Sequence, residues 1–241
     1  MIQFDDLHKS FDGKSVLAGL TLDVRDGETM VIIGYSGTGK SVALKHVVGL
    51  LDPDSGEVRV DGRAVSTLDR DGLITVRRSI GFVFQFAALF DSMTVTDNVA
   101  LGLRRRGLEE EEIGDRVAEA LALVDLTGSG EQYPAELSGG MRKRVGIARA
   151  IAIRPRYILY DEPTTGLDPV TAAVIDQLMV RTREQLSVTG VVVTHDMRSA
   201  YRVGDRIAML YEGKIRQVGT VEEVQATDDP VVRQFIEGRP T

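Results

Sequence analysis

The sequence predicts an α/β fold with a core of parallel strands, a small antiparallel β lobe and a helical insertion. The parallel strands are predicted from short apolar runs that lead into Gly, Asp or Thr, namely "TMVIIG" (29–34), "YILYDEP" (157–163) and "GVVVTHD" (190–196). The lobe is predicted from the period-two alternation of "LTLDV" and "GEVRVDG" in the first third of the chain. The insertion is predicted from the helical spacing of apolar residues between about 93 and 155.

Length and composition limit the classes of protein that fit. The chain has 241 residues, of which 43% are hydrophobic, and we expect one domain over 1–241 with a helical subdomain inserted at about 93–155. The net charge of −7 argues against a broad nucleic-acid-binding face. The absence of cysteine excludes disulfides and thiolate chemistry. The start shows no secretory signal and no apolar run reaches the roughly 18 residues of a membrane span, so we expect a cytoplasmic protein.

The stretch "GYSGTGKS" (34–41) follows a predicted strand and precedes a predicted helix, and it matches G-x-x-x-x-G-K-[ST]. In such a loop the glycines let backbone N–H groups surround the phosphates of a nucleoside triphosphate. Lys40 places a positive charge on the β- and γ-phosphate oxygens, and the Ser41 hydroxyl binds Mg²⁺. The predicted nucleotide-binding residues are Gly34, Tyr35, Ser36, Gly37, Thr38, Gly39, Lys40 and Ser41.

Further polar residues follow the other apolar strands. Asp161 in "YILYDEP" is predicted to bind Mg²⁺, and the adjacent Glu162 to polarise the attacking water. His195, after "VVVT", is predicted to stabilise charge on the γ-phosphate, and Gln85, after "IGFVF", to contact Mg²⁺ or the water. An ordinary turn, a structural histidine and an edge glutamine are the alternatives, and the loop at 34–41 favours the functional interpretation.

A second phosphate-binding element is predicted at "LSGGM" (137–141). Ser138 precedes two glycines and an amphipathic run, which indicates the N-cap of a helix. The N-terminus of a helix presents unpaired N–H groups and a partial positive charge, both of which suit a phosphate. The chain therefore has two phosphate-binding elements but one nucleotide motif.

The order of the phosphate loop, Gln85, "LSGG", "DEP", "TGLDP" and "THD" resembles that of the ATP-binding cassette (ABC) ATPases over essentially the whole chain. The resemblance implies a RecA-like P-loop NTPase core, ATP and Mg²⁺ as cofactors, and ATP hydrolysis coupled to transmembrane transport. It also implies that Asp168 lies in the D-loop, that His195 is the switch histidine and that Phe11, in "HKSFDGKSVL", stacks on adenine.

The same resemblance accounts for the second element. Two cassettes of this family pack head to tail, so Ser138, Gly139 and Gly140 would complete the nucleotide site of the partner subunit in a homodimer. Met141 stands where the family commonly has Gln. The phosphate contacts that we assign come from the Ser hydroxyl and from backbone N–H groups, and we therefore expect hydrolysis to be retained.

Four segments further resemble the Mla/Mce-type lipid-transport ATPases: "GYSGTGKSV", "QFAALFDSMTVTDNVA", "LSGGMRKRVGIARAIA" and "DPVVRQFIEG". This implies phospholipid transport linked to outer-membrane lipid asymmetry, on the cytoplasmic face of the inner (plasma) membrane. The implied partners are integral-membrane permease subunits and an MCE-domain substrate-binding protein. Some relatives extend further to bind a STAS-domain regulatory subunit, and the end at Thr241 leaves that partner open.

The family also receives the coupling helix of the permease near residues 86–99. Apolar residues of this stretch are candidates for that groove, with burial in the helical core as the alternative for each: Phe86, Leu89, Phe90, Met93 and Val95. We expect Leu89→Asp to bind ATP but to release the chain from membranes.

Three other functions are alternatives. An ABC importer ATPase for a small polar solute has the same catalytic motifs, although many such importers carry Pro-His where this chain has Asp91-Ser92. A non-transport ABC ATPase of DNA repair or translation is disfavoured by the single cassette, the missing coiled-coil insertion and the net charge of −7. A P-loop small-molecule kinase is disfavoured because it has no use for "LSGG" or "DEPTTGLDP".

Overall fold

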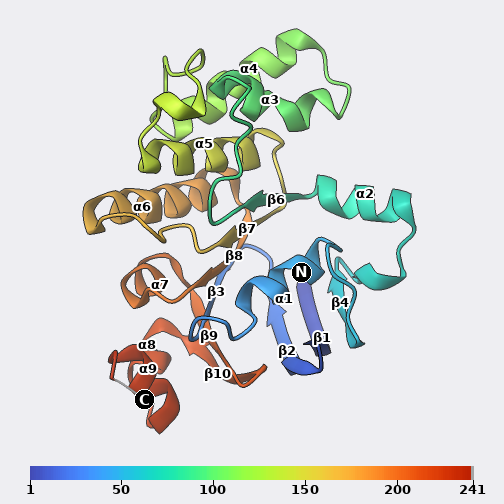
Figure 1. The fold of residues 1–241 in the computed structure, drawn as a ribbon, viewed down its shortest axis with the longest axis vertical. Coiled ribbons are helices and arrows are strands. Elements are labelled where there is room, and N and C mark those ends of the chain that lie inside the picture. The colour runs from blue at the N-terminus through green and yellow to red at the C-terminus, as the bar shows by residue number, and fades with distance from the viewer. Residues whose placement is uncertain (240–241) are drawn as a thin grey trace. The chain divides into compact units, whose positions relative to one another are not determined.

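The computed structural model describes residues 1–239, whose fold is drawn in Figure 1. The chain divides into two compact units. Unit 1 combines Met1–Arg77 with the C-terminal part of the chain from Thr189, and unit 2 is Arg78–Val188. The predicted helical insertion at about 93–155 lies within unit 2. The organisation as one domain stays a prediction.

The N-terminal lobe of unit 1 is an antiparallel sheet in the order β2-β1-β4-β5. Its strands are β1 (Ile2–Phe11), β2 (Lys14–Val24), β4 (Ser55–Val60) and β5 (Arg63–Ala64). The period-two pattern matches the burial, because Val58 and Val60 are buried whereas Arg59 between them is exposed. Asp12 and Gly13 join β1 to β2 with φ values of 50° and 77°, as a tight hairpin turn requires. The predicted antiparallel lobe is confirmed.

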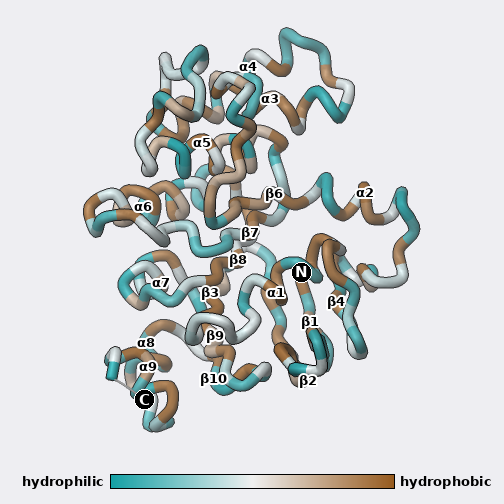
Figure 2. Tube along the Cα trace, viewed as in Figure 1, coloured by the Kyte–Doolittle hydropathy of each residue, from teal (hydrophilic) through white to brown (hydrophobic). Residues whose placement is uncertain are grey.

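Unit 1 also contains β3 (Thr29–Ile33), the strand that leads into the phosphate loop, and the strands that pair beside it. The strands β8 (Thr189–Thr194), β3 and β9 (Arg206–Tyr211) run parallel, and β10 (Lys214–Thr220) pairs antiparallel with β9. Every residue of β3 and β8 is buried, which explains their continuous apolar sequences (Figure 2). The helical segments of this part of the chain are α1 (Lys40–Val47), η1 (Val65–Thr67), α2 (Arg70–Arg78), α7 (Met197–Val203), α8 (Val221–Gln225) and α9 (Pro230–Ile236).

Unit 2 pairs two parallel strands, β6 (Ile80–Val83) and β7 (Tyr157–Asp161), and is otherwise helical. Its helical segments are α3 (Val95–Arg104), α4 (Glu110–Leu123), η2 (Pro134–Glu136), α5 (Gly139–Ala152) and α6 (Pro169–Leu186). Helix α5 packs against α3, α4, α6 and β6, and it is therefore the central helix of the unit. No helix within residues 1–239 combines the length and the hydrophobicity that a bilayer crossing needs.

Side-chain hydrogen bonds cap the first turns of α3, α5 and α6 in unit 2. The Asp97 N–H donates to Thr94 Oγ1 at 3.2 Å, which caps α3. The Met141 N–H donates to Ser138 Oγ at 3.2 Å, which caps α5 and confirms the predicted N-cap. The N–H groups of Val170 and Thr171 donate to one Asp168 carboxylate oxygen, both at 3.0 Å, and cap α6. Helix α5 therefore begins within the predicted phosphate-binding element.

Candidate functional site

The phosphate loop of unit 1 lies between β3 and α1, and its glycines are required by sterics. A Cβ atom on Gly34 would lie 2.5 Å from the Leu210 carbonyl oxygen. A Cβ atom on Gly39 would lie 2.8 Å from Val16 Cγ1, and Gly39 has a φ of 100°. Because a side chain at either position would collide with neighbouring protein atoms, only glycine lets the loop backbone follow this path.

The side chain of Lys40 is folded back over this loop. It is 6% exposed, and its Nζ donates to the carbonyl oxygens of Gly34 at 2.8 Å and Tyr35 at 3.0 Å. The Thr38 hydroxyl donates to the same Tyr35 oxygen at 2.9 Å. The loop therefore holds one positive charge close to its own backbone, as phosphate binding requires.

An aromatic contact joins the phosphate loop to the C-terminal helix of unit 1. The rings of Tyr35 and Phe235 meet edge to face, with centroids 4.9 Å apart and an interplanar angle of 81°. Phe235 belongs to α9, and sequence reasoning did not assign it to the site. No local pattern indicates this contact, because the two residues lie near opposite ends of the chain.

The other predicted residues of unit 1 are His195 and Phe11. Thr194, the last residue of β8, is the register partner of Ile33 at the end of β3, so exposed His195 follows at the strand edge where the phosphate loop begins. Phe11 ends β1 and is 40% exposed, with Lys9 Nζ 5.7 Å from its ring centroid. The roles of both residues stay predictions.

In unit 2 the ends of β6 and β7 bring Gln85, Asp161 and Glu162 to one edge, because Val83 pairs in register with Tyr160. Asp161 and Glu162 are both buried. The Thr165 hydroxyl donates to Glu162 Oε2 at 3.0 Å and holds this carboxylate. Glu162 has a φ of 48°, a left-handed conformation that is uncommon for a residue with a side chain.

Lys143 lies at the same edge, although sequence reasoning did not select it. Its Nζ donates to the carbonyl oxygens of Gln85 and Glu162. Burial lowers the pKa of the Lys143 ammonium, whereas the negative charges of Glu162 and Asp161 act in the opposite direction. The signal for this residue was its place at helical spacing among buried positions of α5, where an ammonium needs acceptors.

The second predicted phosphate-binding element and Asp168 also lie in unit 2. A Cβ atom on Gly140 would lie 2.5 Å from Thr171 Cγ2, and one on Gly139 would lie 3.8 Å from Leu167 Cδ2. The start of α5 therefore packs next to the start of α6. A hydrogen bond from the Thr171 side chain is the main reason that the pKa of Asp168 lies below its ordinary value. Asp168 caps α6, and its predicted part in nucleotide binding stays a prediction.

The donor set predicted for Mg²⁺ is Ser41, Gln85 and Asp161. A hydroxyl, an amide oxygen and a carboxylate are hard oxygen donors, and Mg²⁺ commonly takes one or two carboxylates together with water and phosphate oxygens. This set fits that preference. Among residues 1–239 no three His, Cys, Asp or Glu side chains are grouped to hold a metal ion by themselves.

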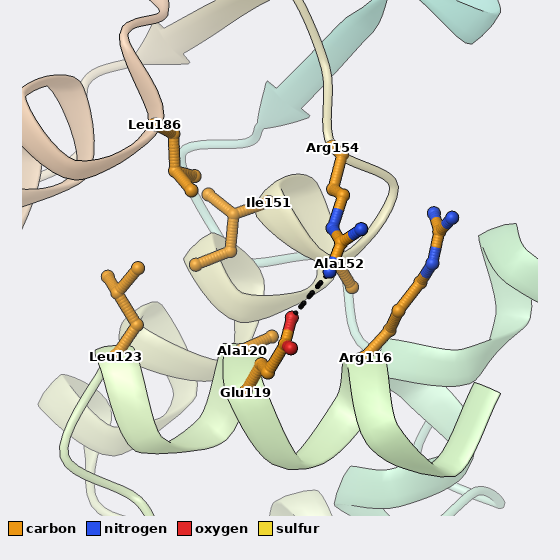
Figure 3. Close-up of a pocket in the computed structure, with 8 residues that line it drawn as sticks. All are labelled: Arg116, Glu119, Ala120, Leu123, Ile151, Ala152, Arg154 and Leu186. Carbon is orange, nitrogen blue, oxygen red and sulfur yellow. Dashed lines mark hydrogen bonds and ion pairs between the residues drawn. The ribbon is translucent and has the colours of Figure 1, made fainter. Parts of the chain in front are cut away.

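Two hollows of unit 2 lie apart from these residues. The first, of about 50 Å³, lies among α4, α5 and α6, with the Glu119–Arg154 ion pair of 2.9 Å at its rim (Figure 3). It contains no predicted site residue. The second is a groove of about 440 Å³ bordered by α3, α4 and residues 127–131.

A third hollow, of about 500 Å³, lies beside the segment that was predicted to receive a permease. Phe90 lines it and is 48% exposed, and neighbouring Phe86 is 85% exposed. Leu89 and Met93 are half-buried. Val95 is fully buried in α3, so the alternative that the sequence left open, burial in the helical core, holds for this residue.

Comparison with known sequences gives close relatives. A sequence model of the family described as ABC transporter matches residues 17–165. The "Probable ribonucleotide transport ATP-binding protein mkl" of Mycobacterium leprae is 43% identical over 239 residues, which are 99% of this chain and 69% of that protein. The "Methionine import ATP-binding protein MetN" of Xylella fastidiosa is 42% identical over 241 residues, covering 98% of this chain and 72% of that protein.

Solved structures show the same fold. A dimeric post-hydrolysis state of the ATP-binding cassette MJ0796 bound to ADP and Pi superposes with a TM-score of 0.84 at 36% identity, over 92% of this chain and 99% of that chain. The structure of cbiO1 from Clostridium perfringens, part of the ABC transporter complex cbiONQ, has a TM-score of 0.86 at 32% identity, over 97% of this chain and 93% of that chain.

Proposed function

The chain belongs to the ABC transporter family as a subunit that binds and hydrolyses ATP with Mg²⁺, and from this premise we propose that it drives import of a small polar solute. The observation that supports the solute class is the similarity to proteins named for ribonucleotide transport and methionine import. The sequence segments favoured phospholipid transport, whereas these names favour the importer that the sequence left as its alternative.

We propose a role for each predicted side chain. Lys40 turns its ammonium from the Gly34 and Tyr35 carbonyls to the β- and γ-phosphates when ATP binds. Ser41, Gln85 and Asp161 would hold Mg²⁺, and the bound ion would supply positive charge to neutralise the phosphates. Glu162 accepts a proton from the attacking water while Thr165 holds its carboxylate.

The remaining roles involve a second subunit. Ser138, Gly139 and Gly140 lie at the N-terminus of α5, where backbone N–H groups and the helix dipole favour an anion. We assign them to the γ-phosphate bound by the partner subunit of a homodimer, and we assign Asp168, which caps the neighbouring helix α6, to the same interface. The dimeric state of the similar cassette MJ0796 supports this arrangement. His195 contacts the γ-phosphate of its own subunit.

Attachment to the membrane is assigned to a permease. The groove beside β6, α3 and α5 is lined by apolar side chains and by Arg105 and Arg149. Exposed Phe86 and Phe90 lie in the segment next to it, and aromatic side chains are common anchors at protein interfaces. The chain would then be peripheral, on the cytoplasmic face of the inner membrane.

A phospholipid is the second candidate for the transported molecule. The Asp91-Ser92 pair and the segment 229–238 favour it, because both resemble the lipid-transport ATPases rather than many small-solute importers. This candidate carries the further partners proposed from the sequence, an MCE-domain protein and a STAS-domain subunit. Both partners are proposed only for a chain that transports a phospholipid.

One experiment separates the two candidates. The complex that co-purifies with this chain is reconstituted in liposomes, and ATP-dependent accumulation of labelled methionine and a labelled ribonucleotide is compared with extraction of a fluorescent phospholipid. We expect accumulation of a polar solute without phospholipid extraction, and the Glu162→Gln complex should do neither. Phospholipid extraction without solute accumulation would replace the importer with the lipid transporter.

A further inference from the structure

One face of α5 packs against the turn Gln85–Ala88, which follows β6. Three residues of the helix, spaced by three, lie against this turn: Lys143, Gly146 and Arg149. Lys143 Nζ donates to the Gln85 carbonyl oxygen. Arg149 donates to the carbonyl oxygens of Ala87 at 2.6 Å and Ala88 at 2.7 Å. A Cβ atom on Gly146 would lie 3.5 Å from Ala87 Cβ, so the helix backbone approaches the turn directly.

The turn needs such support because its backbone is strained. Ala87 and Ala88 have φ values of 58° and 47°, in the left-handed region that alanine rarely adopts. Such conformations persist where the surrounding structure determines them strongly. The two cationic side chains of α5 bind three of the four carbonyl groups of the turn, and they thereby favour this arrangement.

Lys143 also reaches a second strained residue. Its Nζ lies 3.3 Å from the carbonyl oxygen of Glu162, whose φ of 48° is again left-handed. The side chain is 6% exposed, so its hydrogen bonds are not exchanged freely with water. One ammonium therefore ties together the backbones of Gln85 and Glu162, which come from the ends of neighbouring strands.

We infer that Lys143 is a positioning residue for ATP hydrolysis, which holds the backbones of Gln85 and Glu162 at a fixed separation. Arg149 holds the far end of the 85–88 turn to the same helix. Ser138 caps the same helix. Hydrogen bonds of α5 therefore connect its N-terminus, the 85–88 turn and Glu162. The inference rests on the proposed function, in which Glu162 is the base and Gln85 contacts Mg²⁺.

The test compares three substitutions of Lys143 with one control substitution, all in the full chain. Lys143→Met keeps the length of the side chain but removes its donors, and it should lower kcat by roughly 10- to 10²-fold because small displacements of a reacting group are costly. The KM for ATP should stay within about twofold, since the phosphate-binding loop is untouched. Lys143→Arg and Lys143→Gln keep donors and should recover part of kcat. Lys214→Met, at an exposed lysine of β10, is the control and should match the unaltered protein.

A double variant shows whether Lys143 acts through Glu162. If it does, adding Lys143→Met to Glu162→Gln should cause little further loss of kcat, because effects of coupled residues are not additive. A multiplicative loss, a raised KM with kcat unchanged, or normal kinetics in Lys143→Met would each overturn the inference. Should Lys143→Met not fold, Lys143→Gln decides the question, since lowered thermal stability with normal kcat indicates a structural role alone. Normal turnover in Glu162→Gln would instead remove the proposed base.

Discussion

Glu162 combines three properties that few side chains of this protein share. It is buried, its carboxylate accepts a hydrogen bond from Thr165, and its backbone is left-handed. Strained backbone concentrates at functional sites, because the surrounding structure must hold it in place. These properties suit a carboxylate that must remain in one orientation toward a water molecule.

Glu162→Gln should bind ATP normally but lower turnover by roughly 10²–10⁴, the usual contribution of a positioned general base. The amide is the same size but cannot accept the proton, so the ATP-bound dimer should accumulate. Steady-state ATPase assays and size-exclusion chromatography with ATP measure both effects. Glu184→Gln, at an exposed position of α6, is the matched control and should leave turnover unchanged. Near-normal turnover in Glu162→Gln would show that another group is the base.

Tyr160, one residue before Asp161, has a consequence for stability at high pH. Burial raises the pKa of its phenol well above the ordinary value of 10.0. The native state therefore keeps Tyr160 neutral where the unfolded chain ionises it, and native stability falls as pH rises above about 10, by up to about 1.4 kcal/mol per pH unit.

Replacing Tyr160 by Phe removes this ionisation. The free energy of unfolding, measured with urea between pH 8 and 11, should decline less steeply in Tyr160→Phe than in the unaltered protein. Below pH 9 the two proteins should show parallel curves. The same decline in both proteins above pH 10 would show that Tyr160 is not protected from ionisation in the native state.

At the scale of elements, the beginnings of helices were predictable because caps are local. Ser138 and its neighbours in sequence determine where α5 begins, and the apolar runs determine β3, β7 and β8. The left-handed turn at Ala87 and Ala88 was not predictable, since alanine carries no local preference for it. The side chains that bind its carbonyl groups, Lys143 and Arg149, belong to a helix distant in sequence.

The packing of β6 on α5 gives a prediction about glycine. A Cβ atom on Gly81 would lie 2.6 Å from the Ala150 carbonyl oxygen, so Gly81→Ala should lower the stability of unit 2 by about 1–3 kcal/mol, the usual cost of overpacking. A Cβ atom on Gly114, inside α4, would meet no neighbouring atom within 4 Å. Gly114→Ala should therefore raise stability by about 0.5–1 kcal/mol.

Urea unfolding of the two alanine variants measures the predicted loss and the predicted gain of unfolding free energy, both within unit 2. Both substitutions add one methyl group, which meets the Ala150 carbonyl oxygen at Gly81 in a strand and no neighbouring atom at Gly114 in a helix. Equal effects of the two substitutions would show that β6 and α5 separate enough to admit a side chain at Gly81.

At the scale of the whole molecule, the residues predicted for nucleotide binding are divided between the two units. The phosphate loop and His195 belong to unit 1, whereas Gln85, Asp161, Glu162 and the start of α5 belong to unit 2. The motifs of both units were predictable because each is a short sequence with a local backbone geometry. Lys143 was not predicted, because its acceptors are carbonyl groups that only the folded chain brings to it.

The proposed homodimer predicts complementation between two inactive variants. Lys40→Ala disables the phosphate loop of its own subunit, whereas Ser138→Arg blocks the site of the partner. In a mixed dimer one composite site carries both substitutions and the other carries none. A covalently linked mixed dimer, assembled with its permease, should therefore regain measurable ATP hydrolysis.

The control for complementation is the pair of linked dimers that carry one substitution on both subunits, in which each site has a lesion. These should hydrolyse no more ATP than the separate variants. A mixed dimer as inactive as these controls would place Ser138 in its own subunit's site or outside nucleotide binding.

The edge-to-face contact between Tyr35 and Phe235 allows the phosphate loop to be monitored by fluorescence. The chain contains no tryptophan, so Phe235→Trp would introduce a single indole fluorophore beside the loop. When ATP draws Lys40 away from the Tyr35 carbonyl, the surroundings of that indole should change, and its emission should shift in a saturable way with ATP concentration. Adding Lys40→Ala should abolish the shift. An emission spectrum that does not change with ATP concentration would show that the surroundings of α9 are unaffected by ATP binding at the loop.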